Sequence, residues 1–241
     1  MLSNILVLII LFVTNTIQAI TGFAGTLLAM PPTIKLIGPD EAKILLTLVA
    51  QISCALIVIT GWKHINWREF LRMLVLMVIG MAVGMKIYEV FPMNMLLIFY
   101  GILIIIIAVI KLKGSMSPTK TEQALPAWVY VVVILAAGII HGMFSSGGAL
   151  LVVYATHALK DKEEFRATMA MIWVTVGFYI TGVQMSHGYL NSHVLFLLAA
   201  GLIPVFIGTW IGSKLVKKID QQVFLRITYV LLVISGVLAI V

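Results

Sequence analysis

Long apolar runs recur from one end of this chain to the other, and no other feature restricts its fold as strongly. A run of about 20 apolar residues is long enough to cross the hydrocarbon core of a bilayer as a helix. The chain of 241 residues is 62% hydrophobic and 10% charged, whereas a soluble domain has about 25% charged residues. The sequence therefore predicts an all-α polytopic membrane protein with the lipid bilayer as its solvent.

The spacing of these runs predicts the helices. Helices that cross the membrane are expected at 3–22, 41–61, 70–88, 94–112, 127–144, 164–185, 194–213 and 222–240. Two shorter apolar pieces, 26–36 and 148–159, are too short to cross squarely. The first run lacks a basic n-region and an A-x-A-like cleavage site, so we interpret it as a structural helix rather than a signal peptide.

One linker-like segment, GSMSPTKTEQALP at 114–126, divides the chain almost in half. The two halves, 1–113 and 127–241, resemble each other, and we interpret them as repeats within one membrane domain. Three pairs of segments match in order: GTLL from Gly25 with GALL from Gly148 and DEAK from Asp40 with EEFR from Glu163, both at an offset of 123, and IGMAVGMK at 79–86 with IGTWIGSK at 207–214, at an offset of 128.

The positions of Lys and Arg predict how the repeats are oriented, because basic residues gather in cytoplasmic loops. If each short piece forms a hairpin with the helix before it, 13 of the 16 basic residues fall on one side, and only Lys35, Lys43 and Lys86 fall on the other. Each half then has one hairpin with a short broken helix plus three transmembrane helices, so the repeats are inverted. Both termini are expected outside, with the linker in the cytoplasm. If the chain instead crosses the membrane eight times without hairpins, the basic residues are divided less unevenly between the two sides. Ten crossings with two short tilted helices give the same division as the hairpin model.

Two glycine-rich stretches, TGFAGT at 21–26 and HGMFSSGG at 141–148, interrupt the apolar sequence just before the short pieces. An open backbone at membrane depth is tolerated only where it is buried in protein or lines a cavity. A helix N-terminus presents unpaired N–H groups and a partial positive charge, which favour an anion. We therefore expect these two tips to meet near the midplane and bind an anion. A side chain at Gly147 or Gly148 would then fill the space that the anion needs. The alternative is that these glycines only allow close helix packing.

The candidate substrate-binding residues come from the tips and from two neighbouring helices. They are Thr21, Gly22, Phe23, Gly25, Thr26, Gln51, His141, Ser145, Ser146, Gly147, Gly148 and Trp173. For Gln51, in LTLVAQISCAL, hydrogen bonding between helices is the alternative to substrate contact. His141 is either a proton carrier or a buried, hydrogen-bonded side chain. Lys43 and Arg166 either pair with nearby acids or draw anions toward the pathway.

The chain resembles the TauE/SafE family of membrane transporters, the sulfite exporter family. The resemblance lies in ITGFAGTLLAMPP at 20–32 and IHGMFSSGGALLVVY at 140–154, each followed by a charged turn and a long helix. Tyr154 stands where the first half has Pro31. The resemblance implies transport of sulfur-containing anions such as sulfite or organosulfonates across the cell (inner) membrane.

The sequence has few features that indicate other classes of protein. It has no HExxH, GxSxG or acidic metal cluster, so we expect no catalytic residues, no metal, no cofactor and no enzymatic activity. No basic stripe or nucleic-acid-binding fold is visible, so we expect no nucleic-acid partner. The alternatives to a transporter working by alternating access are an anion channel, an integral-membrane enzyme and an assembly subunit. The sequence leaves a homodimer open.

Overall fold

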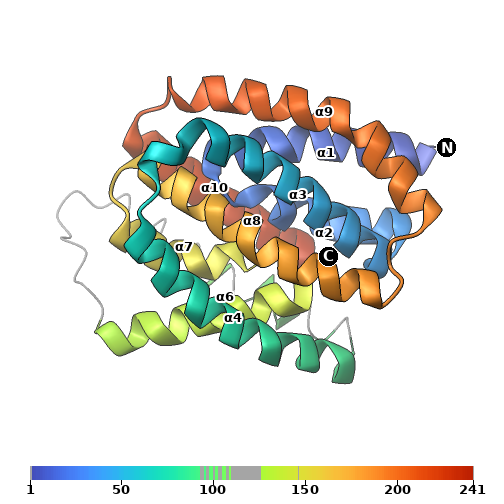
Figure 1. Cartoon of the computed structure of the whole chain (residues 1–241), viewed down its shortest axis with the longest axis horizontal. Helices are drawn as coiled ribbons and strands as arrows, with labels where there is room; N and C mark the ends of the chain where they lie inside the picture. Colours follow the sequence, from blue (N-terminus) through green and yellow to red (C-terminus); the bar gives the residue numbers. More distant parts are fainter. Residues whose placement is uncertain are drawn as a thin grey trace.

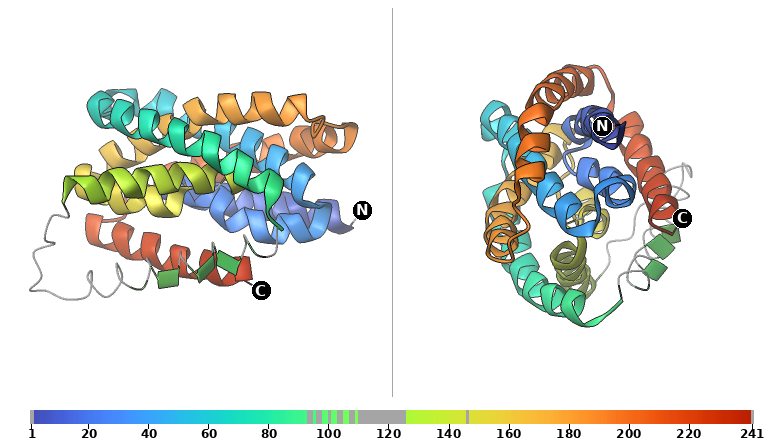
Figure 2. Two further views of the ribbon diagram at one scale, coloured as in Figure 1. Left: turned by 90° about the horizontal axis from the view of Figure 1, so that it is seen from below. Right: turned by 90° about the vertical axis from the view of Figure 1, so that its right-hand side faces the viewer.

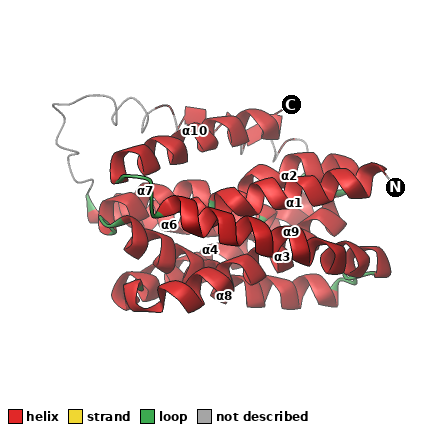
Figure 3. Cartoon of the chain, turned by 90° about the horizontal axis from the view of Figure 1, so that it is seen from above, coloured by secondary structure: helices red, strands yellow, loops and turns green. Residues whose placement is uncertain are grey.

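The protein is described from a computed structural model that covers residues 2–92, 95, 98–99, 101–102, 105–106, 109, 126–145 and 147–240. The expected helix at 94–112 is covered only at scattered positions, and the linker only at Pro126; Ser146 lies outside the described residues. Within the described part the structure is helical without a strand (Figure 3). The helices are α1 (Leu2–Thr21), α2 (Ala24–Ile37), α3 (Pro39–Gly61), the 3-10 turn η1 (Trp62–His64), α4 (Trp67–Val90), α6 (Ala127–Phe144), α7 (Gly148–Ala158), α8 (Lys162–Ser186), α9 (Ser192–Val216) and α10 (Gln221–Ile240).

Five helical segments in the described part are long and apolar enough to cross a membrane. They are Leu2–Thr21, Pro39–His64, Trp67–Val90, Lys162–Ser186 and Ser192–Val216. Large apolar side chains on these helices are exposed on the outside of the bundle. An example is Phe178 of α8, which is 69% exposed. The chain is therefore a multi-pass, all-α membrane protein, as its apolar runs predicted.

Two hairpins enter the bundle from opposite ends (Figures 1 and 2). α1 starts at the end that carries the N-terminus, and α2 returns toward that end. α6 starts at the other end, and α7 returns there. The short helices α2 and α7 are buried over most of their length, so the tips that join each hairpin lie inside the protein.

Glycines on the long helices hold these hairpins in place. α9 packs along α1, and α4 packs along α6, in the two most extensive helix pairings. A Cβ added at Gly212 would lie 2.3 Å from the carbonyl oxygen of Thr16, and one at Gly84 would lie 2.0 Å from that of Ile139. Small residues let membrane helices approach this closely. The helices therefore pack through these glycines.

Contacts between the halves recur at corresponding positions. Gly208 faces the carbonyl of Phe12, and Gly80 faces that of Leu135, which is 123 positions after Phe12. The N-cap side chains of α9 and α4 also correspond. Asn191 donates to Glu41 at 2.7 Å, and Asn66 donates to Glu164 at 2.7 Å. Each half thus holds the other through the same kinds of contact.

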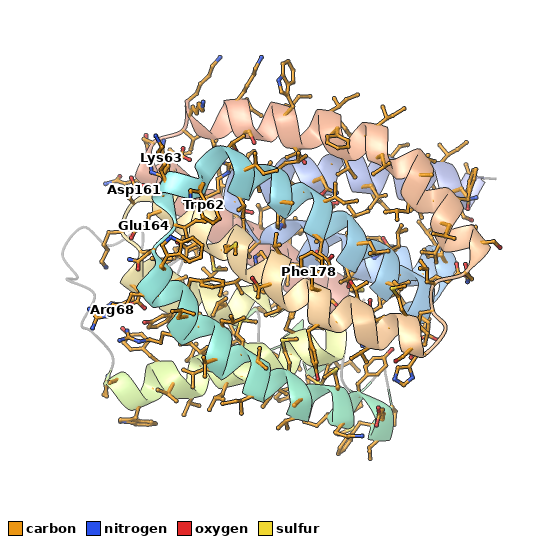
Figure 4. The ribbon with its side chains drawn as sticks, in the orientation of Figure 1. Trp62, Lys63, Arg68, Asp161, Glu164 and Phe178 are labelled. Carbon is orange, nitrogen blue, oxygen red and sulfur yellow. The ribbon has the colours of Figure 1, made fainter. Side chains whose placement is uncertain are left out.

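Charged side chains gather where the α3–α4 and α7–α8 connections meet. Lys63, Arg68, Asp161 and Glu164 lie together at this end, whereas Phe178 lies midway along α8 (Figure 4). Charges at the ends and apolar side chains around the middle are the arrangement that a bilayer requires.

Candidate functional site

The two glycine-rich tips lie on opposite walls of one buried cavity. The space inside it that admits the centre of a water molecule is only about 20 Å³, roughly the room that one ordered water needs. Its described lining residues come from both hairpins and from α3 and α8: Gln18, Phe23, Thr26, Thr47, Ala50, His141, Ser145, Gly148, Trp173 and Gly177. The tips contact each other here, because a Cβ on Gly148 would lie 3.0 Å from Cδ2 of Phe23.

The first tip is closed by its own side chains. Gly22 has a φ of 82°, which turns the chain from α1 into α2. The hydroxyl of Thr21 accepts from the amide of Ala24 at 3.1 Å, and Oε1 of Gln18 accepts from the amide of Gly25 at 2.6 Å. The N-terminus of α2 is therefore capped within the protein, and the side chains of this tip that reach the cavity are Phe23 and Thr26.

The second tip is built in the same way but closed less completely. Ser145 has a φ of 51°, a left-handed conformation that is uncommon outside glycine. The amide of Gly147 donates to Nδ1 of His141 at 3.3 Å, so this amide is already paired. Among the described side chains none caps the N-terminus of α7. The amide of Gly148 and the hydroxyl of Ser145 are thus the described donors of this tip that border the cavity.

His141 and Trp173 stand side by side on the cavity wall, with ring centroids 5.1 Å apart. Nδ1 of His141 accepts a hydrogen bond, which in a neutral imidazole leaves the proton on Nε2 as a donor. The indole N–H of Trp173 donates to the carbonyl of Gly22 at 2.9 Å and so ties α8 to the first tip. The described lining residues include no Asp, Glu, Lys or Arg, and the wall is rich in neutral donors.

Several of the expected site residues meet at this cavity, and others lie behind it. Phe23, Thr26, His141, Ser145, Gly148 and Trp173 line it. Thr21, Gly22, Gly25 and Gly147 shape the tips without lining the cavity, and Ser146 lies outside the described residues. Gln51 donates to the hydroxyl of Thr181 at 2.6 Å, so it joins α3 to α8, as the packing alternative predicted.

Four lining residues were not identified from the sequence: Ala50, Gly177 and two with polar side chains, Thr47 and Gln18. Thr47 lies one turn before Gln51 on α3, and its hydroxyl is 3.1 Å from that of Ser145. Gln18 lies one turn before the first tip and corresponds to His141 at the offset of 123. That correspondence between the repeats was the available signal, because it pairs a polar side chain with each tip.

The two glycines that start α7 differ in what a side chain would meet. A Cβ on Gly147 would lie 2.1 Å from the backbone oxygen of Ala137. A Cβ on Gly148 would meet only the Phe23 ring and backbone, at 3.0 Å and beyond. A side chain on Gly147 would therefore meet α6 first, and the expectation that both glycines border the anion stays a prediction.

Comparison with known proteins agrees with this architecture. The family profile described as sulfite exporter TauE/SafE matches residues 6–239. The chain is also 22% identical, over 177 residues and 73% of each chain, to the probable inner membrane transporter protein TsaS of Comamonas testosteroni. No solved structure matches it. Since the family profile covers nearly the whole chain, this membrane protein belongs to the TauE/SafE sulfite exporter family.

Proposed function

We propose that the protein transports small sulfur-containing oxyanions, such as sulfite or an organosulfonate, across the inner membrane. The observation that carries this proposal is the cavity between the two tips, which is buried, small and lined by neutral donors. Membership of a sulfite exporter family and similarity to a probable inner membrane transporter support the same substrate class.

The donors around the cavity suit an oxyanion. The hydroxyl of Ser145, the amide at the start of α7 and Nε2 of His141 face the cavity from the second tip. The Thr47 hydroxyl of α3 donates to the carbonyl oxygen of Lys43 at 2.7 Å and would turn to donate to the anion. Neutral donors and a helix N-terminus favour an anion without a buried cation that would hold it too tightly. The remaining candidate residues, Thr21, Gly22, Gly25 and Gly147, set the shape of the tips.

The proposed mechanism is alternating access between two inverted repeats. The opposite directions of the α1–α2 and α6–α7 hairpins (Figure 1) and the corresponding contacts of Gly80 and Gly208 support it. Secondary transporters built this way bind substrate near the midplane between discontinuous helices. Rocking one hairpin and its long partner helix against the other would expose the cavity to each side in turn.

The proposed topology places both termini outside and the linker at 114–126 in the cytoplasm. The charged end of the bundle in Figure 4 carries Lys63 and Arg68, and basic residues favour the cytoplasmic side. Repeat 1 then spans 1–113 and repeat 2 spans 127–241.

Uptake by the purified protein in sealed proteoliposomes tests this function. We expect saturable uptake of sulfite or a small sulfonate and no uptake of sodium in the absence of an anion. Sodium uptake without any dependence on anions would contradict the proposal.

An anion channel is the second candidate. Single-channel currents in a planar bilayer would favour a channel over a transporter, because alternating access does not permit continuous conduction.

A further inference from the structure

A second cavity lies beside the first, toward the end of the bundle that carries the N-terminus. About 40 Å³ of its space admits the centre of a water molecule. Its described lining residues are Lys43, Met85, Tyr88, Glu89, Gly142, Ile180, Val183, Gln184, His187 and Tyr189. Four of these, Tyr88, Glu89, His187 and Tyr189, come from the end of α4 or the α8–α9 connection, where the helices leave the membrane. This cavity therefore adjoins one surface of the protein.

Lys43 is the buried cation of this second cavity. Its side chain is only 8% exposed. Nζ lies 3.5 Å from the carbonyl oxygen of Gly142 and 3.7 Å from the centre of the Tyr88 ring. Among the described residues no carboxylate forms an ion pair with it. The charge of Asp40 acts on Lys43 without forming a direct ion pair. A buried ammonium with no direct ion pair is costly, so a mobile anion beside it would be favourable.

The corresponding cation of the second half is engaged quite differently. Arg166 lies 123 positions after Lys43, and its Nε donates to the carbonyl of Ala19, which corresponds to Gly142. Unlike Lys43, Arg166 also donates to Ser213 at 2.6 Å and pairs with Glu163 at 3.5 Å. The two cations therefore share one backbone contact, but only Lys43 faces open space.

The acidic groups around the second cavity are already occupied. Glu89 pairs with Lys86 at 3.4 Å. Burial, followed by the charge of Asp40 and its hydrogen bond, raises the pKa of Tyr189 above the usual value for a tyrosine. Tyr189 thus keeps its proton, and its hydroxyl donates a hydrogen bond to Asp40, which stays negatively charged. Among the described residues neither acid forms a direct ion pair with Lys43, so its ammonium can still contact an incoming anion.

The side-chain amide of Gln184 lies between this cavity and the central one. Nε2 of Gln184 donates to the hydroxyls of Thr47 and Ser145, at 3.3 and 3.4 Å, and both hydroxyls line the central cavity. Oε1 of Gln184 is buried and has no hydrogen-bond partner among the described residues. A half-turn of the amide would let Oε1 accept from the Ser145 hydroxyl and would present the two N–H donors of the amide to the second cavity.

We propose that the second cavity is an entry site for a small oxyanion, held by Lys43, and that Gln184 is the gate through which the anion passes to Ser145 and Thr47. The proposal rests on the proposed function, since it gives the central site a path to one surface. The anion binds Lys43 first, the Gln184 amide turns to donate to it, and the tip hydroxyls then receive it.

Cysteine accessibility tests the entry site directly. Val183 lines the second cavity, and the background is Cys54→Ser, because Cys54 is the single cysteine of the chain. In the Val183→Cys protein the probe is methanesulfonate, and the readout is the rate of reaction with sulfonatoethyl methanethiosulfonate. We expect methanesulfonate to slow this reaction in a saturable way. Adding Lys43→Gln should raise the half-protecting concentration of methanesulfonate by about tenfold or more, because the anion loses one charged partner. Lys43→Arg keeps the charge and should leave that concentration close to its original value.

The matched control is Lys35→Gln, which removes the same charge from an exposed position near the same end of the bundle. It should leave the half-protecting concentration unchanged. Equal protection with and without Lys43 would overturn its role, and no protection in a protein that still transports would overturn the entry site alone. No protection together with no transport of any oxyanion would overturn the proposed function as well. If Lys43→Gln does not fold, protection of the Val183→Cys protein still decides whether an anion binds there.

Discussion

Gly22 and Ser145 occupy corresponding places at the two tips, and both have a positive φ, 82° and 51°. The first position has the residue that adopts this conformation freely, whereas the second has a serine. Ser145 also brings a hydroxyl to the central cavity, 3.1 Å from that of Thr47. Strained residues persist where the surroundings fix them, and they cluster at functional sites. We infer that the strained backbone of Ser145 is retained because it places the hydroxyl at the cavity.

Two substitutions at Ser145 separate strain from binding. Ser145→Ala and Ser145→Gly both remove the hydroxyl, so each should weaken sulfite binding by about 1.5–3 kcal/mol, the value of one hydrogen bond to a charged group. Ser145→Gly should be more stable than Ser145→Ala by about 1 kcal/mol, because only glycine relieves the left-handed backbone. Thermal unfolding and equilibrium binding of both variants are the measurements. Equal stability of the two would show that this backbone carries no strain.

The glycines at the helix pairings give a prediction about stability. Gly84→Ala and Gly212→Ala each place a Cβ against a backbone carbonyl, at 2.0 and 2.3 Å, so both should lower stability by about 1–3 kcal/mol through overpacking. Gly182 of α8 is the matched control, since a Cβ there would meet nothing within 4 Å. Thermal unfolding of the three variants in one detergent checks this. A Gly182→Ala variant as unstable as the other two would rule out the packing explanation.

The first two glycines of α7 should respond in opposite ways. Gly147→Ala forces a Cβ to within 2.1 Å of the Ala137 oxygen and should destabilise the fold. Gly148→Val projects toward Phe23 and the cavity, so it should leave the protein folded and reduce anion affinity by about tenfold or more. Binding and melting temperature are measured on the same preparations. Normal affinity in a folded Gly148→Val protein would mean that the anion binds elsewhere.

Trp173 should report on the central cavity. Trp173→Phe removes the hydrogen bond to the carbonyl of Gly22 and should cost about 0.5–1.5 kcal/mol of stability. Because Trp173 lines the cavity beside His141, its fluorescence should change when sulfite binds, and the change should disappear in Trp173→Phe. Trp210 is the control: it is 60% exposed on α9, and Trp210→Phe should retain the fluorescence change.

Sidedness is testable at two connections between long helices. In a Cys54→Ser background, Lys63→Cys lies in the turn between α3 and α4, and Ser192→Cys lies at the start of α9. We expect a membrane-impermeant maleimide applied outside intact cells to label Ser192→Cys only, and Lys63→Cys to be labelled after the inner face is opened. Labelling of both from the outside would contradict the proposed topology.

The helices and the positions of the two tips could be predicted from the sequence, because apolar run length and breaks in those runs are local signals. Every described helix overlaps an expected one. What escaped prediction depends on contacts between distant segments. Gln51 resembled a site residue in sequence, but its bond to Thr181 joins two helices. Thr47 gave no local signal, because its role comes from Ser145 of the other half.

The same limit applies to the two cavities. Lys43 and Arg166 could be matched from sequence, but the sequence does not say which of them faces open space. That difference arises from Ser213 and Glu163, which hold Arg166. Side-chain partners across helices, unlike helix spans, become visible only in three dimensions.

The pairing of α1 with α9 has a consequence for synthesis. α1 is made long before α9, the partner against which Thr16 packs, which starts at Ser192, roughly 170 residues later. At about 5–20 residues per second, α1 waits on the order of 10 s or more in the membrane. Throughout that wait, its face with Phe12 and Thr16 must be shielded by lipid or by the insertion machinery. α1 thus finds this native neighbour late, and nascent chains that stop before α9 should be the ones that quality control removes.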